Sequence, residues 1–180
     1  TGGNGSNTEY AGAIGGASCA LTKVGSGTLT LSGTNTYTGT TTVSAGSLTL
    51  SGGAAIADTG AVNLSTSGAN LTLSSSETIG SLAGVSGTTV TLGANTLTVG
   101  NGSNTEYAGV LIWAIAAPSK EEYGTLTLSG TNTYTGTTTV RAGRLTLSGC
   151  AAIADTGAVN LSTSGATLTL SRSHTIGSLP

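Results

Sequence analysis

The sequence predicts an all-β solenoid, in which the chain coils repeatedly and stacks its strands in parallel, and three observations support this prediction. Residues 28–82 return at 125–179 with an offset of 97 and six changes, and repetition at a fixed spacing is typical of stacked architectures. Leu, Val and Ile alternate with Thr and Ser, which is the pattern of half-buried strands. Strands of the form Leu-Thr-Leu or Leu-Thr-Val recur every 19 to 29 residues.

The composition favours ordered β structure and argues against two classes of protein. Gly is abundant, with 30 residues, but the Thr side chains are β-branched and suit a pleated surface. A net charge of −2 offers no basic stripe for nucleic acid. The apolar run 110–117 is far shorter than the roughly 20 residues that a membrane-spanning helix needs. We therefore expect no nucleic-acid partner and no membrane insertion by this segment.

A finer period divides the repeat into coils. The first Leu of the recurring strand lies at Leu29, Leu48, Leu71, Leu97, Leu126, Leu145 and Leu168. The first four spacings are 19, 23, 26 and 29, which together make 97. We therefore expect a four-coil unit used nearly twice, in which each of these strands lies beside the previous one and their Leu side chains form inward ladders.

This division predicts one domain over residues 1–180, with an internal repeat at 1–97 and 98–180. Glycines such as Gly33 and Gly46 are expected at the corners, where positive φ is tolerated. About seven to eight rungs, stacked about 4.8 Å apart, predict a rod near 35 Å long. The chain begins in the middle of a repeat unit, so we expect either a fragment or an engineered protein.

One stretch resembles a known family. Residues 21–48 read LTKVGSGTLTLSGTNTYTGTTTVSAGSL, which is similar to the autotransporter-associated β-strand repeat of bacterial passenger domains. The second copy retains the motif over 125–145 but lacks the LTKVGSG lead-in. The resemblance implies a right-handed parallel β-helix that acts as a stalk. It also implies a bacterial cell-surface or secreted location, reached through the outer membrane.

The resemblance carries no catalytic residues, and we expect no cofactor. Expected partners are a host-surface or matrix protein, a glycan, or further copies of the chain.

Segment 110–124 differs from its counterpart 13–27 at most positions but has the same length. As a recognition loop it would use Trp113 and Tyr123 as aromatic anchors, with Lys120 and the following two glutamates on a polar rim. The simpler alternative is an apolar cap that folds over the side of the solenoid.

The six point changes place Arg141, Arg144, Cys150, Thr167, Arg172 and His174 in the second copy. Counting from the Leu-Thr-Leu strands predicts that Cys150, Arg172 and His174 share one corner. A thiol beside an imidazole and a cation can act as a nucleophile, although the sequence offers no orienting third group. Solvated surface substitutions are the simpler interpretation.

Three of these changes introduce arginine, and clustered Arg side chains can bind an anion such as phosphate or a sulfated sugar. The site would need Arg141, Arg144 and Arg172 to converge on one face. Asp58 and Asp155 occupy the same corner in both copies. They would suit a glycosidase-type site, but a lone Asp at a corner is more simply a turn cap.

The cysteines give a test of the rung assignment. Cys19 and Cys150 are expected six rungs apart, about 29 Å, which is far beyond disulfide reach. Both thiols should therefore be free. The sequence has no paired Cys-x-x-Cys and one His, so we expect no metal site.

The leading hypothesis is a structural or adhesive surface rod without catalytic activity of its own. The alternatives are a binding module that uses segment 110–124 with the three arginines, and an enzyme that uses Cys150 and His174.

Overall fold

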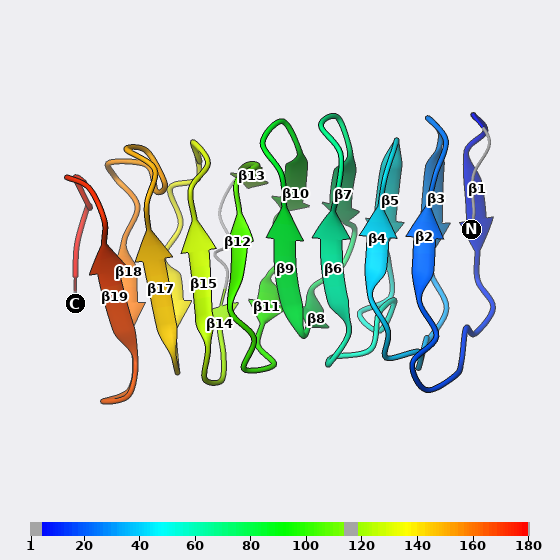
Figure 1. Cartoon of the computed structure of the whole chain (residues 1–180), viewed down its shortest axis with the longest axis horizontal. Helices are drawn as coiled ribbons and strands as arrows, with labels where there is room; N and C mark the ends of the chain where they lie inside the picture. The colour runs from blue at the N-terminus through cyan, green and yellow to red at the C-terminus, as the bar shows by residue number, and fades with distance from the viewer. Residues whose placement is uncertain (1–4, 114–118, 180) are drawn as a thin grey trace.

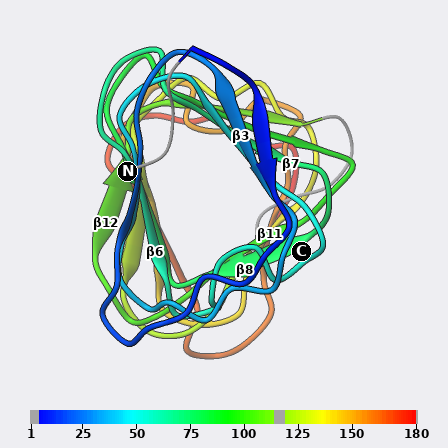
Figure 2. The ribbon, with the colours of Figure 1, turned by 90° about the vertical axis from the view of Figure 1, so that its right-hand side faces the viewer.

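The structure, a computed structural model, describes residues 5–113 and 119–179. Within these ranges the chain forms parallel strands that belong to three sheets, which are the three walls of a rod. Figure 1 shows the coils stacked along the rod, with the N-terminus at one end and the C-terminus at the other. The view along the axis shows the coils following nearly the same three-sided outline (Figure 2).

Between residues 61 and 128, each circuit of the chain, which we call a coil, passes the sheets in the order A, B, C. Before this stretch the described strands belong to sheets A and B, and after it they belong to sheets A and C. Sheet A consists of β2 (Leu21–Lys23), β4 (Thr41–Val43), β6 (Ala61–Leu64), β9 (Ser81–Gly84), β12 (Thr105–Tyr107), β15 (Thr125–Leu128), β17 (Arg144–Leu147) and β19 (Thr167–Leu170). Sheet B consists of β1 (Thr8–Tyr10), β3 (Thr28–Leu31), β5 (Ser47–Leu50), β7 (Asn70–Leu73), β10 (Thr89–Gly93) and β13 (Val110–Trp113). Sheet C consists of β8 (Glu77–Ile79), β11 (Leu97–Val99), β14 (Ser119–Lys120), β16 (Thr138–Val140) and β18 (Val159–Leu161).

The predicted fold class is confirmed, because the chain is an all-β parallel solenoid of about seven coils. Leu29 pairs with Leu48 and Leu48 with Leu71, so identical side chains stack in register. The strand β5 shows the expected alternation, with Leu48 and Leu50 fully buried and Ser47 and Thr49 partly exposed. The core is therefore a set of aliphatic ladders inside the three walls, and the right hand implied by the resemblance stays a prediction.

The two copies of the repeat occupy different walls. The first TLTL strand, β3, belongs to sheet B, whereas its counterpart β15 belongs to sheet A. In the same way β4 lies in sheet A and its counterpart β16 in sheet C. The path from β3 makes four coils to reach β13 in sheet B and then passes β14 before it enters β15. The repeat therefore spans four and two-thirds coils, and equivalent residues face different directions.

This geometry corrects the predicted rung division. Leu97 lies in sheet C, where β11 pairs with β8 and β14, and it does not stack on Leu71. Paired residues on neighbouring coils are 19 to 23 residues apart. The spacings of 26 and 29 were too long for one coil because each includes one additional wall. The Leu-Thr-Leu pattern specifies an inward-facing strand, but it does not specify which wall the strand joins.

Close packing of the coils explains one glycine in each copy. Gly46 and Gly143 have positive φ values of 65° and 71°. A Cβ atom at these positions would collide with the backbone oxygens of Gly27 and Gly124 on the preceding coil. Glycine is therefore required at this corner for its φ and for the approach of the neighbouring backbone.

Replacing Leu71 with Ala should destabilise the protein by about 2–5 kcal/mol, because it opens a cavity in a fully buried ladder. Its counterpart Leu168 lies in the last described strand and is only partly buried, so Leu168→Ala should cost clearly less. Urea unfolding of both variants measures the difference. Equal losses would contradict the burial pattern.

Candidate functional site

The most distinctive side chains of the repeat are polar groups inside the solenoid, and the first is Lys23. Its side chain is 1% exposed. The Nζ atom donates to the backbone oxygens of Val24, Gly25 and Ala45 at 2.8, 2.7 and 3.2 Å. Burial lowers the pKa of this ammonium group. Lys23 therefore satisfies carbonyl groups at the corner that follows β2, including one from the next coil.

Lys120 repeats this arrangement in the second copy. It is 3% exposed, and its Nζ donates to the backbone oxygens of Glu121 and Glu122, both at 2.7 Å. Burial lowers its pKa, and the charges of Glu122 and Glu121 oppose this shift. The predicted place of Lys120 on a polar rim is therefore wrong, because the corner needs a buried donor for its carbonyl groups.

Asparagine side chains join neighbouring coils where the chain forms no strand. Asn35 accepts from the N–H of Ile14 at 2.6 Å and donates to the oxygen of Ala55 at 2.8 Å. In the second copy, Asn132 accepts from Leu111 and donates to Ala152, both at 2.7 Å. Each amide thus links three consecutive coils and replaces hydrogen bonds that a strand would make.

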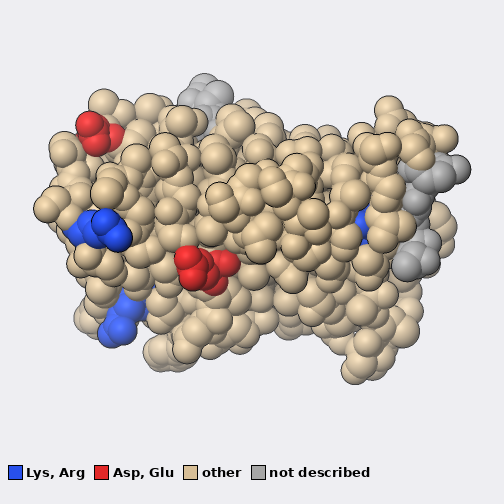
Figure 3. Space-filling view, turned by 45° about the horizontal axis from the view of Figure 1, so that its top comes forward, with Lys and Arg blue, Asp and Glu red and all other residues tan. Residues whose placement is uncertain are grey.

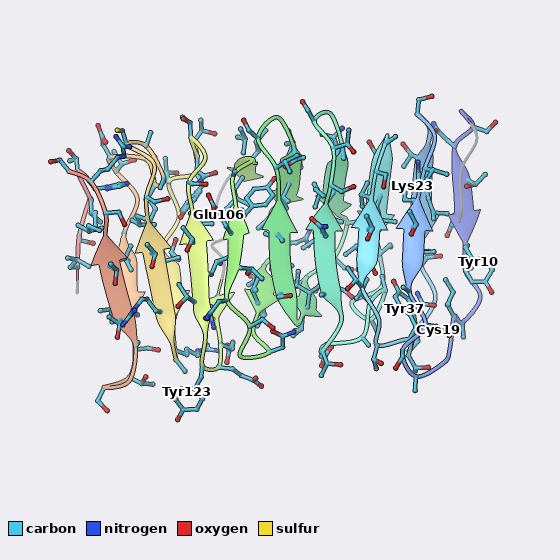
Figure 4. All side chains as sticks on the ribbon, in the orientation of Figure 1. Tyr10, Cys19, Lys23, Tyr37, Glu106 and Tyr123 are labelled. Atoms are coloured by element: carbon cyan, nitrogen blue, oxygen red, sulfur yellow. The ribbon has the colours of Figure 1, made fainter. Side chains whose placement is uncertain are left out.

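Two tyrosines of the motif are fully buried beside these amides. The hydroxyl of Tyr37 lies 2.6 Å from Oγ1 of Thr41, and that of Tyr134 lies 2.9 Å from Oγ1 of Thr138. Burial raises the pKa of both phenols. Figure 4 labels Tyr37 and Lys23, which both lie near the N-terminal end of the rod. These side chains fill the interior and pair with the chain itself.

Among the described residues, Glu77 is the carboxylic acid that is buried. It is 3% exposed, and its Oε1 accepts from the N–H of Ile56 at 2.8 Å, whereas Oε2 has no hydrogen-bond partner among the described residues. Desolvation is the main cause that raises its pKa, hydrogen bonds from Ile56 and Ala55 oppose the shift, and Asp58 adds to it.

The variant segment 110–124 is described in part. Trp113 ends β13, but its side chain and residues 114–118 lie outside the described residues. Tyr123 is 79% exposed, as a contact residue would be. Glu121 forms an ion pair with Arg141. The recognition role of Trp113 and Tyr123 stays a prediction.

The three arginines are exposed and do not form one cluster. Arg141 and Arg144 flank the corner that leads into β17. Arg144 pairs with Thr167 at the start of β19, so Arg172 lies five residues farther along, about 17 Å at the rise of an extended strand. Figure 3 shows separate charged groups on a mostly uncharged surface. An anion site that needs all three side chains is not favoured by this register.

The prediction that Cys150, Arg172 and His174 share a corner assumed that Leu145 lies beside Leu168. The structure has this pairing between β17 and β19. Cys150 is exposed, and Nδ1 of His174 lies 3.0 Å from the backbone oxygen of Arg172. The hydrogen bonds of the described residues include none between Cys150 and His174, so the thiol nucleophile stays a prediction. Cys19 and Cys150 are both free thiols, as expected for two residues six rungs apart.

Asp58 lies at a shallow surface hollow. Thr78, Thr98 and two glutamates, Glu121 and Glu122, also line it. Across residues 5–113 and 119–179, no group of three or more His, Cys, Asp or Glu residues is placed to hold a metal ion. The same part of the chain contains no helix that is long and apolar enough to span a membrane.

Sequence reasoning missed the interior polar set, namely Lys23, Asn35, Tyr37 and their counterparts. A signal was present, because Lys120 is one of the few residues of segment 110–124 that agree with the first copy. Lys and Asn are usually exposed, and only the closed coil shows that they face carbonyl groups.

Replacing Lys23 with Met should destabilise the protein by about 1–3 kcal/mol, because buried carbonyl oxygens lose their donor. Lys120→Met should also destabilise the protein. Arg144→Met, at an exposed position, serves as the control and should change stability by less than about 0.5 kcal/mol. Urea unfolding measures all three. A lysine variant as stable as the control would show that the ammonium group is dispensable.

Replacing Glu77 with Gln should stabilise the protein at neutral pH. The folded-state pKa of Glu77 is raised above its ordinary value of 4.5. Protonated Glu77 therefore makes its whole contribution to the free energy of unfolding at pH values below 4.5. This contribution is lost as pH rises through the folded pKa. The side-chain oxygen of Gln can still accept the hydrogen bond from the N–H of Ile56, and the side chain carries no charge. Melting temperatures from pH 4 to 8 test this, with the exposed Glu122→Gln as control, and an unchanged pH slope in Glu77→Gln would contradict it.

Comparison with known proteins identifies the repeated segments. The family model described as Passenger-associated-transport-repeat matches residues 21–54 and 120–149, about a third of the chain. Each match has a buried lysine at or near its start, Lys23 in the first and Lys120 in the second, and includes the Asn and Tyr of the motif. No curated protein and no solved structure matches the chain. The chain therefore contains two passenger-associated transport repeats, the repeats of autotransporter passenger domains, which are exported through the outer membrane to the surface or secreted.

Proposed function

We propose that this chain is a rigid stalk segment of an exported passenger, which holds other parts of the protein away from the bacterial surface. The observation that carries the proposal is the burial of the repeat's polar side chains. Lys23, Asn35 and Tyr37 all bond to the chain itself. The motif therefore uses its functional groups to build the coil and leaves none of the three for a ligand.

The different walls of the two copies support the same conclusion. A repeated binding surface would gain avidity only if its copies could engage one partner together. Here β3 and its counterpart β15 lie in different sheets, so equivalent outer faces point in different directions. The duplication thus lengthens the rod, and adhesive contacts, where the segment has them, would lie at positions that differ between the copies.

A binding module remains the second candidate because of Tyr123. This ring is 79% exposed in a segment that was replaced without a change of length. Exposed Tyr side chains are common anchors in protein interfaces. A host-surface protein, a matrix protein or a glycan would be the partner.

Proteins that join one, two or three copies of the 97-residue repeat should form progressively longer rods of constant thickness. Each added coil should extend the rod by about 4.8 Å, the spacing of neighbouring strands. Small-angle X-ray scattering measures length and cross-section separately. A maximum dimension that does not grow with copy number would contradict the stalk proposal.

The binding alternative predicts a different result. Exchanging 110–124 for 13–27 should abolish saturable binding to a panel of matrix proteins and glycans, while the circular dichroism spectrum stays unchanged. Tyr123→Ala should reduce the same binding, and Tyr10→Ala is the matched control outside the segment. The stalk proposal expects no saturable binding from either form of the chain.

A further inference from the structure

We propose that Asn101 is a site of spontaneous covalent modification, at which water converts the side-chain amide to a carboxylate through a succinimide. The proposal goes beyond the stalk role, because it concerns the chemistry of one corner and not the length of the rod. The corner joins β11 to β12 (Figure 1) and reads Gly-Asn-Gly-Ser over residues 100–103. The residue that follows the asparagine and the hydrogen bonding of its amide support the proposal.

The reaction takes place between neighbouring groups of the chain. The backbone nitrogen of Gly102 gives up its proton and attacks Cγ of Asn101, so that a new N–Cγ bond closes the succinimide ring. The bond from Cγ to Nδ2 breaks, and Nδ2 takes up a proton and leaves as ammonia. Water then opens the ring at either carbonyl carbon and gives aspartate or isoaspartate. Water is the co-reactant, and nothing is oxidised or reduced.

Gly102 leaves its backbone nitrogen open to this reaction. A side chain would shield the nitrogen, and glycine has none, which permits close approach to the backbone. Gly102 is exposed and has a φ of 77°. The hydrogen bonds found among the described residues include none from its N–H. Every other asparagine within residues 5–113 and 119–179 precedes Thr or Leu, whose side chains cover the following nitrogen.

The amide of Asn101 is held by its oxygen and not by its nitrogen. Oδ1 accepts from the N–H of Ser103 at 3.1 Å. Negative charge develops on this oxygen when the nitrogen attacks, and a donor already in place stabilises that charge. Nδ2 lies against Gly80 of the preceding coil, where a Cβ atom would come within 2.7 Å of it. The hydrogen bonds of the described residues include none from Nδ2, so it leaves without breaking one.

Other asparagines lack this combination. Nδ2 of Asn95 donates to the backbone oxygen of Leu73 at 3.0 Å, so its loss would break a bond between coils. Asn104 lies at the same corner, and its Oδ1 accepts from the N–H of Thr125 at 2.8 Å. The residue after it is the β-branched Thr105, which begins β12. Asn104 therefore has a comparable bond to its oxygen without the open nitrogen, and it is a matched comparison.

The two products should affect the corner differently. Aspartate adds a negative charge next to Gly100, which lines the hollow at Asp58. Isoaspartate also adds a carbon atom to the backbone between β11 and β12. The backbones of neighbouring coils are close here, because a Cβ atom on Gly124 would collide with the carbonyl group of Gly102. Isoaspartate should therefore loosen the stacking of the coils, whereas aspartate should leave it intact.

The test is a timed incubation of the folded full chain at neutral pH, followed by cleavage after glutamate and mass spectrometry of peptide 78–106. This peptide contains Asn95, Asn101 and Asn104, so the site and its controls are measured together. The inference predicts release of ammonia and the mass gain of an amide converted to an acid at Asn101, severalfold faster than at Asn104.

Gly102→Ala should slow the conversion severalfold, because its methyl group covers the attacking nitrogen, and circular dichroism checks that this variant is folded. Asn101→Asp should melt as the fresh chain does, whereas the aged sample, in which isoaspartate-specific methylation detects the isomer, should melt at a lower temperature. An Asn101 that converts no faster than Asn104 overturns the inference, as does a folded Gly102→Ala chain that converts at the original rate. Neither outcome bears on the rod length that tests the stalk.

Discussion

The parallel pairing of each coil with the next is the interaction on which the rest of this structure depends. A coil of about 21 residues cannot enclose its own apolar side chains, and the backbone groups of its strands have partners only on neighbouring coils. Stacking satisfies both needs at once, because it pairs the N–H and C=O groups and aligns Leu48 with Leu71 and their equivalents. The register is strict, since a shift by one residue would turn every Leu outward.

The same constraint explains the polar interior. At the corners between walls, and where a wall contains no strand, some backbone carbonyl and amide groups have no strand partner. Lys23 and Asn35 supply the missing donors and acceptors. Their counterparts do so on different walls, which shows that the arrangement belongs to the local motif and not to one side of the rod.

Most of the fold was predictable from the sequence, and the candidate site much less so. Strand positions, the direction of Leu and Val, and the free cysteines followed from alternation and spacing. The wall occupied by Leu97 did not, because the same Leu-Thr-Val pattern suits any of the three sheets. Lys120 was assigned to the surface, since nothing in its neighbours reveals that two carbonyl groups converge on its side chain.

By itself, the sequence determined that this protein coils, because strands with a period of two that recur every 19 to 29 residues leave few other ways to bury the Leu side chains. It also determined that the two copies share local structure. Only the tertiary structure decided how the copies relate in space. The offset of 97 residues exceeds a whole number of coils by two thirds, and that remainder depends on the length of each circuit around a closed core, which no local pattern specifies.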